Sequence, residues 1–191
     1  MEWTVRQANK DDCWKIVSLT RDNLDVLMPY TAGVNTTMGY IDQFMVAESW
    51  PEIYKGDRKD TNSTLYLRGA VHFIPNDDVD IRTSDRVECF LNSVKQVPYD
   101  LVCDFMSKPH NRKLAFIGQV ICPGKGSFYA ILEEAKKQYD EIWCWMSIAG
   151  PSYKSYQRYG FNLNMDDVRE FWNVYKCDYS KFVLGKWIKE V

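Results

Sequence analysis

The sequence predicts a mixed α/β domain, and three patterns carry this prediction. The chain opens as a short strand, a turn and a helix over residues 3–24. Its last third begins as a strand, a glycine-containing turn, a helix and a second strand over residues 114–146. Two further strands are expected near residues 171–177 and 181–188. The length of 191 residues fits one domain spanning residues 1–191.

Local spacing predicts the elements of the first half of the chain. Asn9 stands where a helix cap is expected, before apolar residues that recur at helical intervals. Apolar residues also recur at helical intervals over residues 38–48, which predicts a second helix. Strand patterns cover residues 64–74 and 101–106, whereas residues 86–91 fit either a helix or a strand.

The pattern is clearest in the last third of the chain. An apolar strand over residues 114–122 leads into the turn Pro123-Gly124-Lys125-Gly126. The next helix is indicated by apolar residues at i, i+3, i+4 and i+7, namely Phe128, Ile131, Leu132 and Ala135. A strand over residues 142–146 follows, and then a short helix from Pro151 to Tyr159 that stops at Gly160.

Composition excludes several classes of protein. The 24 Lys and Arg residues are balanced by 26 Asp and Glu, so the basic excess of a nucleic-acid-binding protein is absent. The six cysteines form no C-x-x-C pair and only two histidines are present, so we expect no metal site. No apolar run approaches the roughly 18–20 residues of a membrane-spanning helix, and residues 1–6 do not resemble a signal peptide. We therefore expect a cytoplasmic protein with reduced cysteines and without nucleic-acid or membrane partners.

The turn at residues 123–126 has a direct chemical use. The first amides of a helix lack intrahelical partners, and the helix dipole places partial positive charge there. Glycines let a phosphate approach the backbone closely, and Lys125 adds a positive charge. Two glycines before a helix more often mark a simple turn, so this pattern alone leaves a phosphate cradle and a plain turn open.

A second motif follows at Tyr156-Gln157-Arg158-Tyr159-Gly160-Phe161. Together with the loop and helix of residues 126–135, it resembles the GNAT superfamily of acyl-CoA-dependent N-acetyltransferases, in which a late helix ends in Tyr-x-x-x-Gly-Phe. The resemblance is specific over residues 114–161, the implied cofactor-binding core, and nearly absent over residues 28–110, the implied variable acceptor-side region. It implies a GNAT-like, mostly antiparallel twisted sheet with helices on both faces and one parallel strand pair at the cofactor cleft.

The loop departs from the family pattern Gln/Arg-x-x-Gly-x-Gly/Ala. If Gly124 and Gly126 are its two glycines, Ile121 holds the Gln/Arg position. If Gly126 is the first glycine, Pro123 holds that position and Phe128 replaces the second glycine. Helix spacing favours the second alignment, and either alignment loses a polar loop residue.

The resemblance implies direct transfer of an acetyl group from acetyl-CoA to an amine in a ternary complex, without a metal. The implied coenzyme A-binding residues are Val120, Ile121, Cys122, Gly124, Lys125, Gly126, Ser127 and Phe128. Tyr156 would protonate the leaving thiolate, because a tyrosine pKa near ~10 suits a thiolate of similar basicity. The alternative for Tyr156 is an aromatic core residue. No general base is evident, since Asp104 is expected to be an exposed strand carboxylate and His72 and His110 ordinary histidines.

Two other functions remain open. The altered loop and the missing base favour a catalytically inactive GNAT-shaped protein, and residues 139–143 resemble internal virion proteins of short-tailed bacteriophages, which would place the chain in a virion. A non-catalytic acyl-CoA sensor would keep the pocket without the chemistry. The implied acceptor is an amine of a small molecule or a protein, and a homodimer is left open. Six tryptophans are expected in the core rather than in a ligand cage: Trp3, Trp14, Trp50, Trp143, Trp145 and Trp172.

Overall fold

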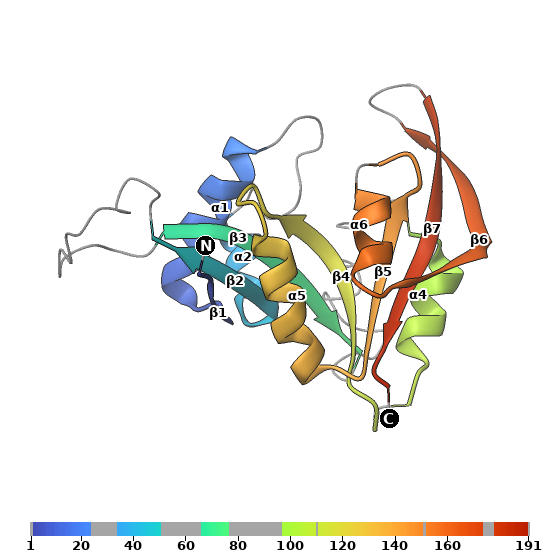
Figure 1. The fold of residues 1–191 in the computed structure, drawn as a ribbon, viewed down its shortest axis with the longest axis horizontal. Coiled ribbons are helices and arrows are strands. Elements are labelled where there is room, and N and C mark those ends of the chain that lie inside the picture. Colours follow the sequence, from blue (N-terminus) through green and yellow to red (C-terminus); the bar gives the residue numbers. More distant parts are fainter. Residues whose placement is uncertain are drawn as a thin grey trace. The chain divides into compact units, whose positions relative to one another are not determined.

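The computed structural model describes residues 2–23, 34–50, 66–76, 97–109, 111–150, 152–173 and 178–190. Its strands are β1 (Thr4–Gln7), β2 (Phe44–Ser49), β3 (Tyr66–Pro75), β4 (Leu114–Ile121), β5 (Glu141–Ser147), β6 (Asn162–Asn173) and β7 (Asp178–Ile188). These strands of the described residues form one sheet in the order β1-β2-β3-β4-β5-β7-β6 (Figure 1). β4 and β5 pair in parallel, whereas the pairs β1–β2, β2–β3, β5–β7 and β6–β7 are antiparallel. The predicted mixed, mostly antiparallel sheet is confirmed.

The helices are α1 (Cys13–Asp22), α2 (Val34–Gly39), α4 (Tyr99–Met106), α5 (Ser127–Gln138) and α6 (Ser152–Arg158), with 3-10 segments η1 (Lys10–Asp12) and η3 (Ile41–Gln43). Within the described residues, none of them has the length and apolar character needed to span a membrane. The chain divides into two compact units. The first comprises Met1–His72 and Val120–Glu134, and the second comprises Phe73–Gln119 and Ala135–Val191. One domain over residues 1–191 stays a prediction.

In the first unit, the N-terminal helix packs on the sheet through a buried apolar cluster. The cluster consists of Ala8, Cys13, Ile16, Ile41, Phe44, Val46, Ala70 and Ile121. The helix start predicted at Asn9 is confirmed, because its side chain accepts from the Asp11 amide and its own amide donates to Asp12, both at 2.9 Å. The buried Asp12 carboxylate also accepts from Arg6 at 2.6 and 2.9 Å, which ties β1 to the helix.

The helix predicted over residues 38–48 is wrong. α2 ends at Gly39, η3 follows, and β2 begins at Phe44. Every residue of β2 is buried, so the alternation that marks a half-exposed strand is missing from the sequence. The backbone of β2 pairs with β1 on one side and β3 on the other, and this long-range pairing overrides the helical spacing.

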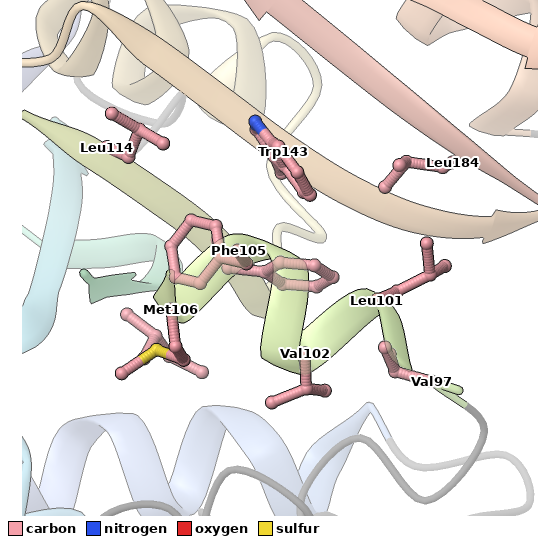
Figure 2. Packing of buried hydrophobic residues seen from close by; sticks show 10 residues of the cluster. Val97, Leu101, Val102, Phe105, Met106, Leu114, Trp143 and Leu184 are labelled. Carbon is pink, nitrogen blue, oxygen red and sulfur yellow. The ribbon is translucent and has the colours of Figure 1, made fainter. Parts of the chain in front are cut away.

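The strand predicted over residues 101–106 is also wrong, because α4 occupies this segment in the second unit. Its buried side chains follow one face of the helix: Leu101, Val102, Phe105 and Met106. Figure 2 shows Leu101 and Phe105 on the side of α4 that faces Trp143 and Leu184. The Phe105 ring meets the Trp143 ring edge-on, with centroids 5.5 Å apart. A short apolar run fits a helix or a strand equally, so the tertiary packing decides between them.

Helices cover both faces of the strands in the second unit, as predicted. α4 packs on the face that carries Trp143. Trp187 pairs with Ile142, one position before Trp143, and therefore lies on the opposite face. On that face the Lys136 ammonium of α5 stands 5.4 Å from the Trp187 ring centroid, and a Cβ atom on Gly160, after α6, would stand 3.6 Å from the same ring.

β6 begins at Asn162, well before the strand predicted near residues 171–177. Its first half is rich in Asn and Asp, which disfavour strands, and its pairing with β7 is interrupted between Asn164 and Arg169. Hydrogen bonds to β7 outweigh this local composition. The predictions for residues 24, 86–91, 151 and 174–177 and for His110 fall outside the described residues.

Candidate functional site

The strand, turn and helix predicted around residues 122–127 are confirmed, since β4 ends at Ile121 and α5 begins at Ser127. Gly126 has a φ of +89°, a backbone conformation that other residues rarely adopt. Its carbonyl accepts from the amide of Ala130 at 3.0 Å, which opens the hydrogen-bond ladder of α5. Gly126 therefore both turns the chain and starts the helix.

Ser127 stabilises the loop through hydrogen bonds made from a buried position. It is fully buried, and its amide and its hydroxyl both donate to the carbonyl of Gly124, at 2.9 and 2.7 Å. Gly69 of β3 is in close contact with Ser127, because a Cβ atom on Gly69 would stand 2.8 Å from Ser127 Oγ. The turn is thus closed by its own hydrogen bonds and by close contact with β3.

A β-bulge in β3 anchors the loop from the neighbouring strand. β2 pairs with Leu67 and Gly69 at successive positions, which leaves Arg68 without a partner in β2. The carbonyl of Arg68 instead accepts from the amide of Gly124 at 3.1 Å. The irregularity in the sheet therefore fixes the position of the loop backbone.

The loop keeps hydrogen-bond donors for a ligand. Within the described part of the chain, the amides of Lys125 and Gly126 donate to no acceptor, and Pro123 has no N–H. The Lys125 side chain is exposed. Two available amides, an ammonium group and the positive end of the α5 dipole together suit a phosphate group.

The other predicted cofactor residues differ in their surroundings. Val120 is 40% exposed, whereas Ile121 is buried in the core of the first unit. Phe128 is half-buried at the start of α5. Burial raises the pKa of the Cys122 thiol to about 12, so this residue is a neutral thiol near pH 7. A Cβ atom on Gly69 would stand 3.0 Å from Cys122 Sγ, so the thiol packs against β3.

The Tyr156 motif forms the end of α6. Gly160 has a φ of +84°, the Phe161 amide donates to the Tyr156 carbonyl at 3.1 Å, and the Gly160 amide donates to the Gln157 carbonyl at 3.1 Å. These two bonds make a Schellman cap, in which a glycine and the following apolar residue end a helix. The rings of Tyr156 and Phe161 meet edge-on with centroids 5.0 Å apart, and only 6% of Tyr156 is exposed. Tyr156, Gly160 and Phe161 therefore each have a structural role.

Two of the residues considered as a general base, Asp104 and His72, are engaged elsewhere. Asp104 lies on α4 and not on a strand, and its carboxylate pairs with Lys108 Nζ at 2.9 Å. Nε2 of His72 lies 2.7 Å from Gln43 Oε1 in the buried interior. Burial lowers the pKa of His72 to about 3, so its ring is neutral near pH 7. Asp104 belongs to a surface ion pair, and His72 belongs to the core.

The parallel strand pair stops short of the strand ends. Paired residues of β4 and β5 run from Leu114 opposite Glu141 to Ile117 opposite Cys144. Both strands then continue, β4 to Ile121 and β5 to Ser147. Beyond Ile117 the two strands are no longer paired with each other.

Comparison with solved structures identifies the fold. An acetyltransferase of the GNAT family from Streptococcus pneumoniae matches with a TM-score of 0.57 and 12% identity, over 98% of this chain and 100% of that chain. Arabidopsis thaliana NAA60 in complex with acetyl-CoA matches with a TM-score of 0.58 and 15% identity, over 98% and 100%. YncA of Salmonella typhimurium with its cofactor acetyl-CoA matches with a TM-score of 0.57 and 13% identity, over 100% of this chain and 96% of that chain. The chain has the GNAT fold. No family model and no curated protein sequence matches it.

The GNAT fold brings residues to the loop that the sequence analysis missed. Arg68 and Gly69 reach it from β3, and Trp3 reaches it from the position just before β1. Gly69 carries the one local signal that points to this arrangement, because a glycine inside a strand pattern often marks a bulge or a close backbone approach. Trp3 and Arg68 carry none.

Two further predictions concern tryptophans and metals. Trp143 is fully buried in this GNAT fold, but Trp14 and Trp50 are 65% and 50% exposed, so their predicted core position is wrong. A surface tryptophan has the same local pattern as a buried one. Among the residues that the structure describes, no group of three or more His, Cys, Asp or Glu is placed to hold a metal ion. The absence of a metal stays a prediction.

Proposed function

We propose that this chain is an N-acetyltransferase that moves an acetyl group from acetyl-CoA to an amine by direct attack in a ternary complex. The observation that carries the proposal is the 122–127 loop, which presents the amides of Lys125 and Gly126 and the Lys125 ammonium at the start of α5. This donor set suits the diphosphate of coenzyme A. The solved structures of NAA60 and YncA, which share the fold, contain acetyl-CoA.

The proposed coenzyme A site comprises Val120, Ile121, Cys122, Gly124, Lys125, Gly126, Ser127 and Phe128. Within it, the amides of Lys125 and Gly126 bind phosphate oxygens, while Ser127 and Gly124 keep the loop in shape through their shared hydrogen bonds. Both alignments with the family pattern assign a cradle glycine to Gly126, the residue with positive φ. When bound, acetyl-CoA supplies an activated thioester for attack by a neutral amine.

Tyr156 is the proposed proton donor to the leaving thiolate. Its place four residues before Gly160 matches the family motif, and a phenol with a pKa near ~10 suits a thiolate of similar basicity. Its burial and its contact with Phe161 support the alternative of a purely structural residue. Removing only the hydroxyl distinguishes these roles.

Acetyl-CoA is expected to raise the melting temperature of the protein, because a ligand that binds only the native state stabilises it by mass action. The measurement is a thermal unfolding series up to millimolar acetyl-CoA, with pantetheine as the control that lacks the diphosphate. Release of free thiol with a panel of amines then tests for transfer. An unchanged melting temperature at millimolar acetyl-CoA would contradict a working cosubstrate site.

A second candidate is a GNAT-fold protein that lacks catalysis and serves as a binding or virion component. The observation that favours it is the state of the base candidates: Asp104 is paired with Lys108, and His72 is buried and neutral. An inactive structural protein does not bind acetyl-CoA in a calorimetric titration. A non-catalytic acyl-CoA sensor binds it but releases no thiol with any amine.

A further inference from the structure

The indole ring of Trp3 lies along the 122–127 loop. A Cβ atom on Gly124 would stand 2.9 Å from Cη2 of Trp3, and a Cβ atom on Gly126 would stand 3.5 Å from Nε1 of the same ring. Cη2 and Nε1 belong to opposite halves of the indole. The ring therefore spans the loop from one glycine to the other.

The two glycines meet the ring differently. At Gly124 a side chain would clash with Cη2 of Trp3 and also with Cβ of Arg68, at 3.0 Å, so the contact is already tight. At Gly126 the position of a Cβ atom lies at ordinary contact distance from Nε1, and no heavy atom of another described residue outside Lys125 and Ser127 comes within 4 Å of it. The space next to Gly126 is thus bordered by the nitrogen edge of the indole.

This edge carries an available donor. Trp3 is half-buried, and within the described part of the chain its indole N–H makes no hydrogen bond. An indole nitrogen is a donor only, so it can complement an oxygen acceptor but not another donor. The neighbouring donors, the amides of Lys125 and Gly126, are available in the same way.

Two cationic side chains start at the loop. Lys125 and Arg68 are both exposed, and neither forms an ion pair with a residue that the structure describes. Arg68 Cβ lies next to Gly124, so its flexible side chain starts at the loop. Three N–H donors flanked by two cationic side chains favour an anionic ligand with several acceptor oxygens.

We propose that Trp3 is a binding residue of the cosubstrate's diphosphate: its indole N–H donates to a phosphate oxygen held at Lys125 and Gly126, while its ring keeps Gly124 in place. This inference rests on the proposed function, because it assigns one more donor to the same coenzyme A site. Trp3, the residue before β1, adds a side-chain donor to a loop in which Ile121 or Pro123, depending on the alignment, stands where the family pattern has Gln or Arg.

The direct test follows the indole N–H signal of Trp3 in ¹H–¹⁵N correlation spectra of the wild-type protein, assigned by through-bond experiments, during a titration with coenzyme A. We expect this signal to move downfield, as a donor to a charged oxygen does, while the indole signal of the exposed Trp14 stays in place. Dephospho-CoA, which keeps the diphosphate but lacks the 3′-phosphate, is expected to produce the same shift. A shift that requires the 3′-phosphate would overturn the assignment to the diphosphate.

The affinity test compares Trp3→Phe, which removes the N–H but keeps an aromatic ring, with the matched control Trp14→Phe. Calorimetry is expected to show that Trp3→Phe binds coenzyme A about tenfold more weakly than the parent, the factor typical for the loss of one hydrogen bond to a charged group. Binding by Trp14→Phe is expected to be unchanged. Unchanged binding in Trp3→Phe, or a Trp3 signal that stays still while other amides shift, would overturn the role of Trp3 and leave the proposed function standing. If coenzyme A shifts no signal at all, the proposed function fails and this inference fails with it.

Discussion

A Cβ atom on Gly69 would lie 2.8 Å from Oγ and 2.9 Å from Cβ of Ser127. Real Cβ atoms essentially never approach so closely, so β3 and the first residue of α5 touch at a point where only glycine fits. Ser127 has no room to retreat, because it is fully buried and its hydroxyl is bonded to Gly124. The position of the 122–127 loop therefore depends on a glycine in a strand that is distant in sequence.

Gly69→Ala is expected to lower the free energy of unfolding by about 1–3 kcal/mol, the usual cost of overpacking a filled interior. It is also expected to weaken coenzyme A binding, because Ser127 and the loop must shift. Gly39→Ala is the matched control, since a Cβ atom there meets nothing within 4 Å. Urea unfolding and calorimetry measure both effects. Equal stability of the two variants would contradict a close contact between Gly69 and Ser127.

Gly126→Glu is expected to abolish coenzyme A binding, because its carboxylate enters the space next to the loop amides and repels a phosphate. The positive φ at position 126 also strains the backbone of any residue with a side chain there, at a cost of about 1–2 kcal/mol. Gly126→Gln carries the same strain and size without the charge, so the difference between the two variants isolates the repulsion. Calorimetry at equal, verified folding gives the comparison. A Glu variant that binds as tightly as the parent would place the phosphate elsewhere.

Tyr156→Phe is expected to keep coenzyme A affinity and to lower turnover. General acid catalysis typically contributes ~10²–10⁴-fold, and a loss of only about tenfold is still compatible because water can substitute for the hydroxyl. Tyr153→Phe is the matched control on the same helix, since among the described residues its hydroxyl makes only an exposed contact of 3.7 Å with Met165 Sδ. Turnover and melting temperature are measured on the same preparation. Lower stability with unchanged turnover would assign Tyr156 to structure alone.

His72 makes the native state sensitive to acid. Burial lowers its pKa from the usual 6.5 to about 3, so between these values the unfolded chain binds a proton that the native chain does not. The stabilising contribution is therefore complete above pH 6.5 and is lost as the pH falls towards 3, by about 2 kcal/mol at pH 5. Urea unfolding at pH 7.5 and pH 5 measures the loss. His72→Gln, which does not titrate, is expected to lose about 2 kcal/mol less than the parent, and an equal loss would contradict the assignment.

Protonation of Asp12 affects the stability of the native state at a lower pH than protonation of His72. Burial raises the pKa of this carboxyl, but hydrogen bonds from Arg6 and the Asn9 amide outweigh burial and hold the pKa below its usual 3.8. Its stabilising contribution is thus present above that value and is lost only as the pH falls below it. Asp12 therefore adds nothing to the loss of stability between pH 7.5 and pH 5.

Some features of this protein were determined by the sequence alone, because they depend on bonds between near neighbours. The helix start at Asn9, the turn of Gly126 into α5 and the cap formed by Tyr156, Gly160 and Phe161 each involve backbone groups within a few residues. Special backbone angles and caps depend on residue type, so the motifs at residues 122–127 and 156–161 were predictable. The resemblance to the GNAT superfamily implied a parallel strand pair, and β4 and β5 form one.

Other features were decided only by the tertiary structure. Residues 101–106 form a helix because their apolar face packs on Trp143, and β2 is a strand because two other strands bind its backbone. The surroundings of the loop are likewise built from Trp3 and Arg68, which are distant from it in sequence. Local propensity is weak compared with the burial and hydrogen bonds that distant segments supply on folding, and no local pattern records which distant segment will supply them.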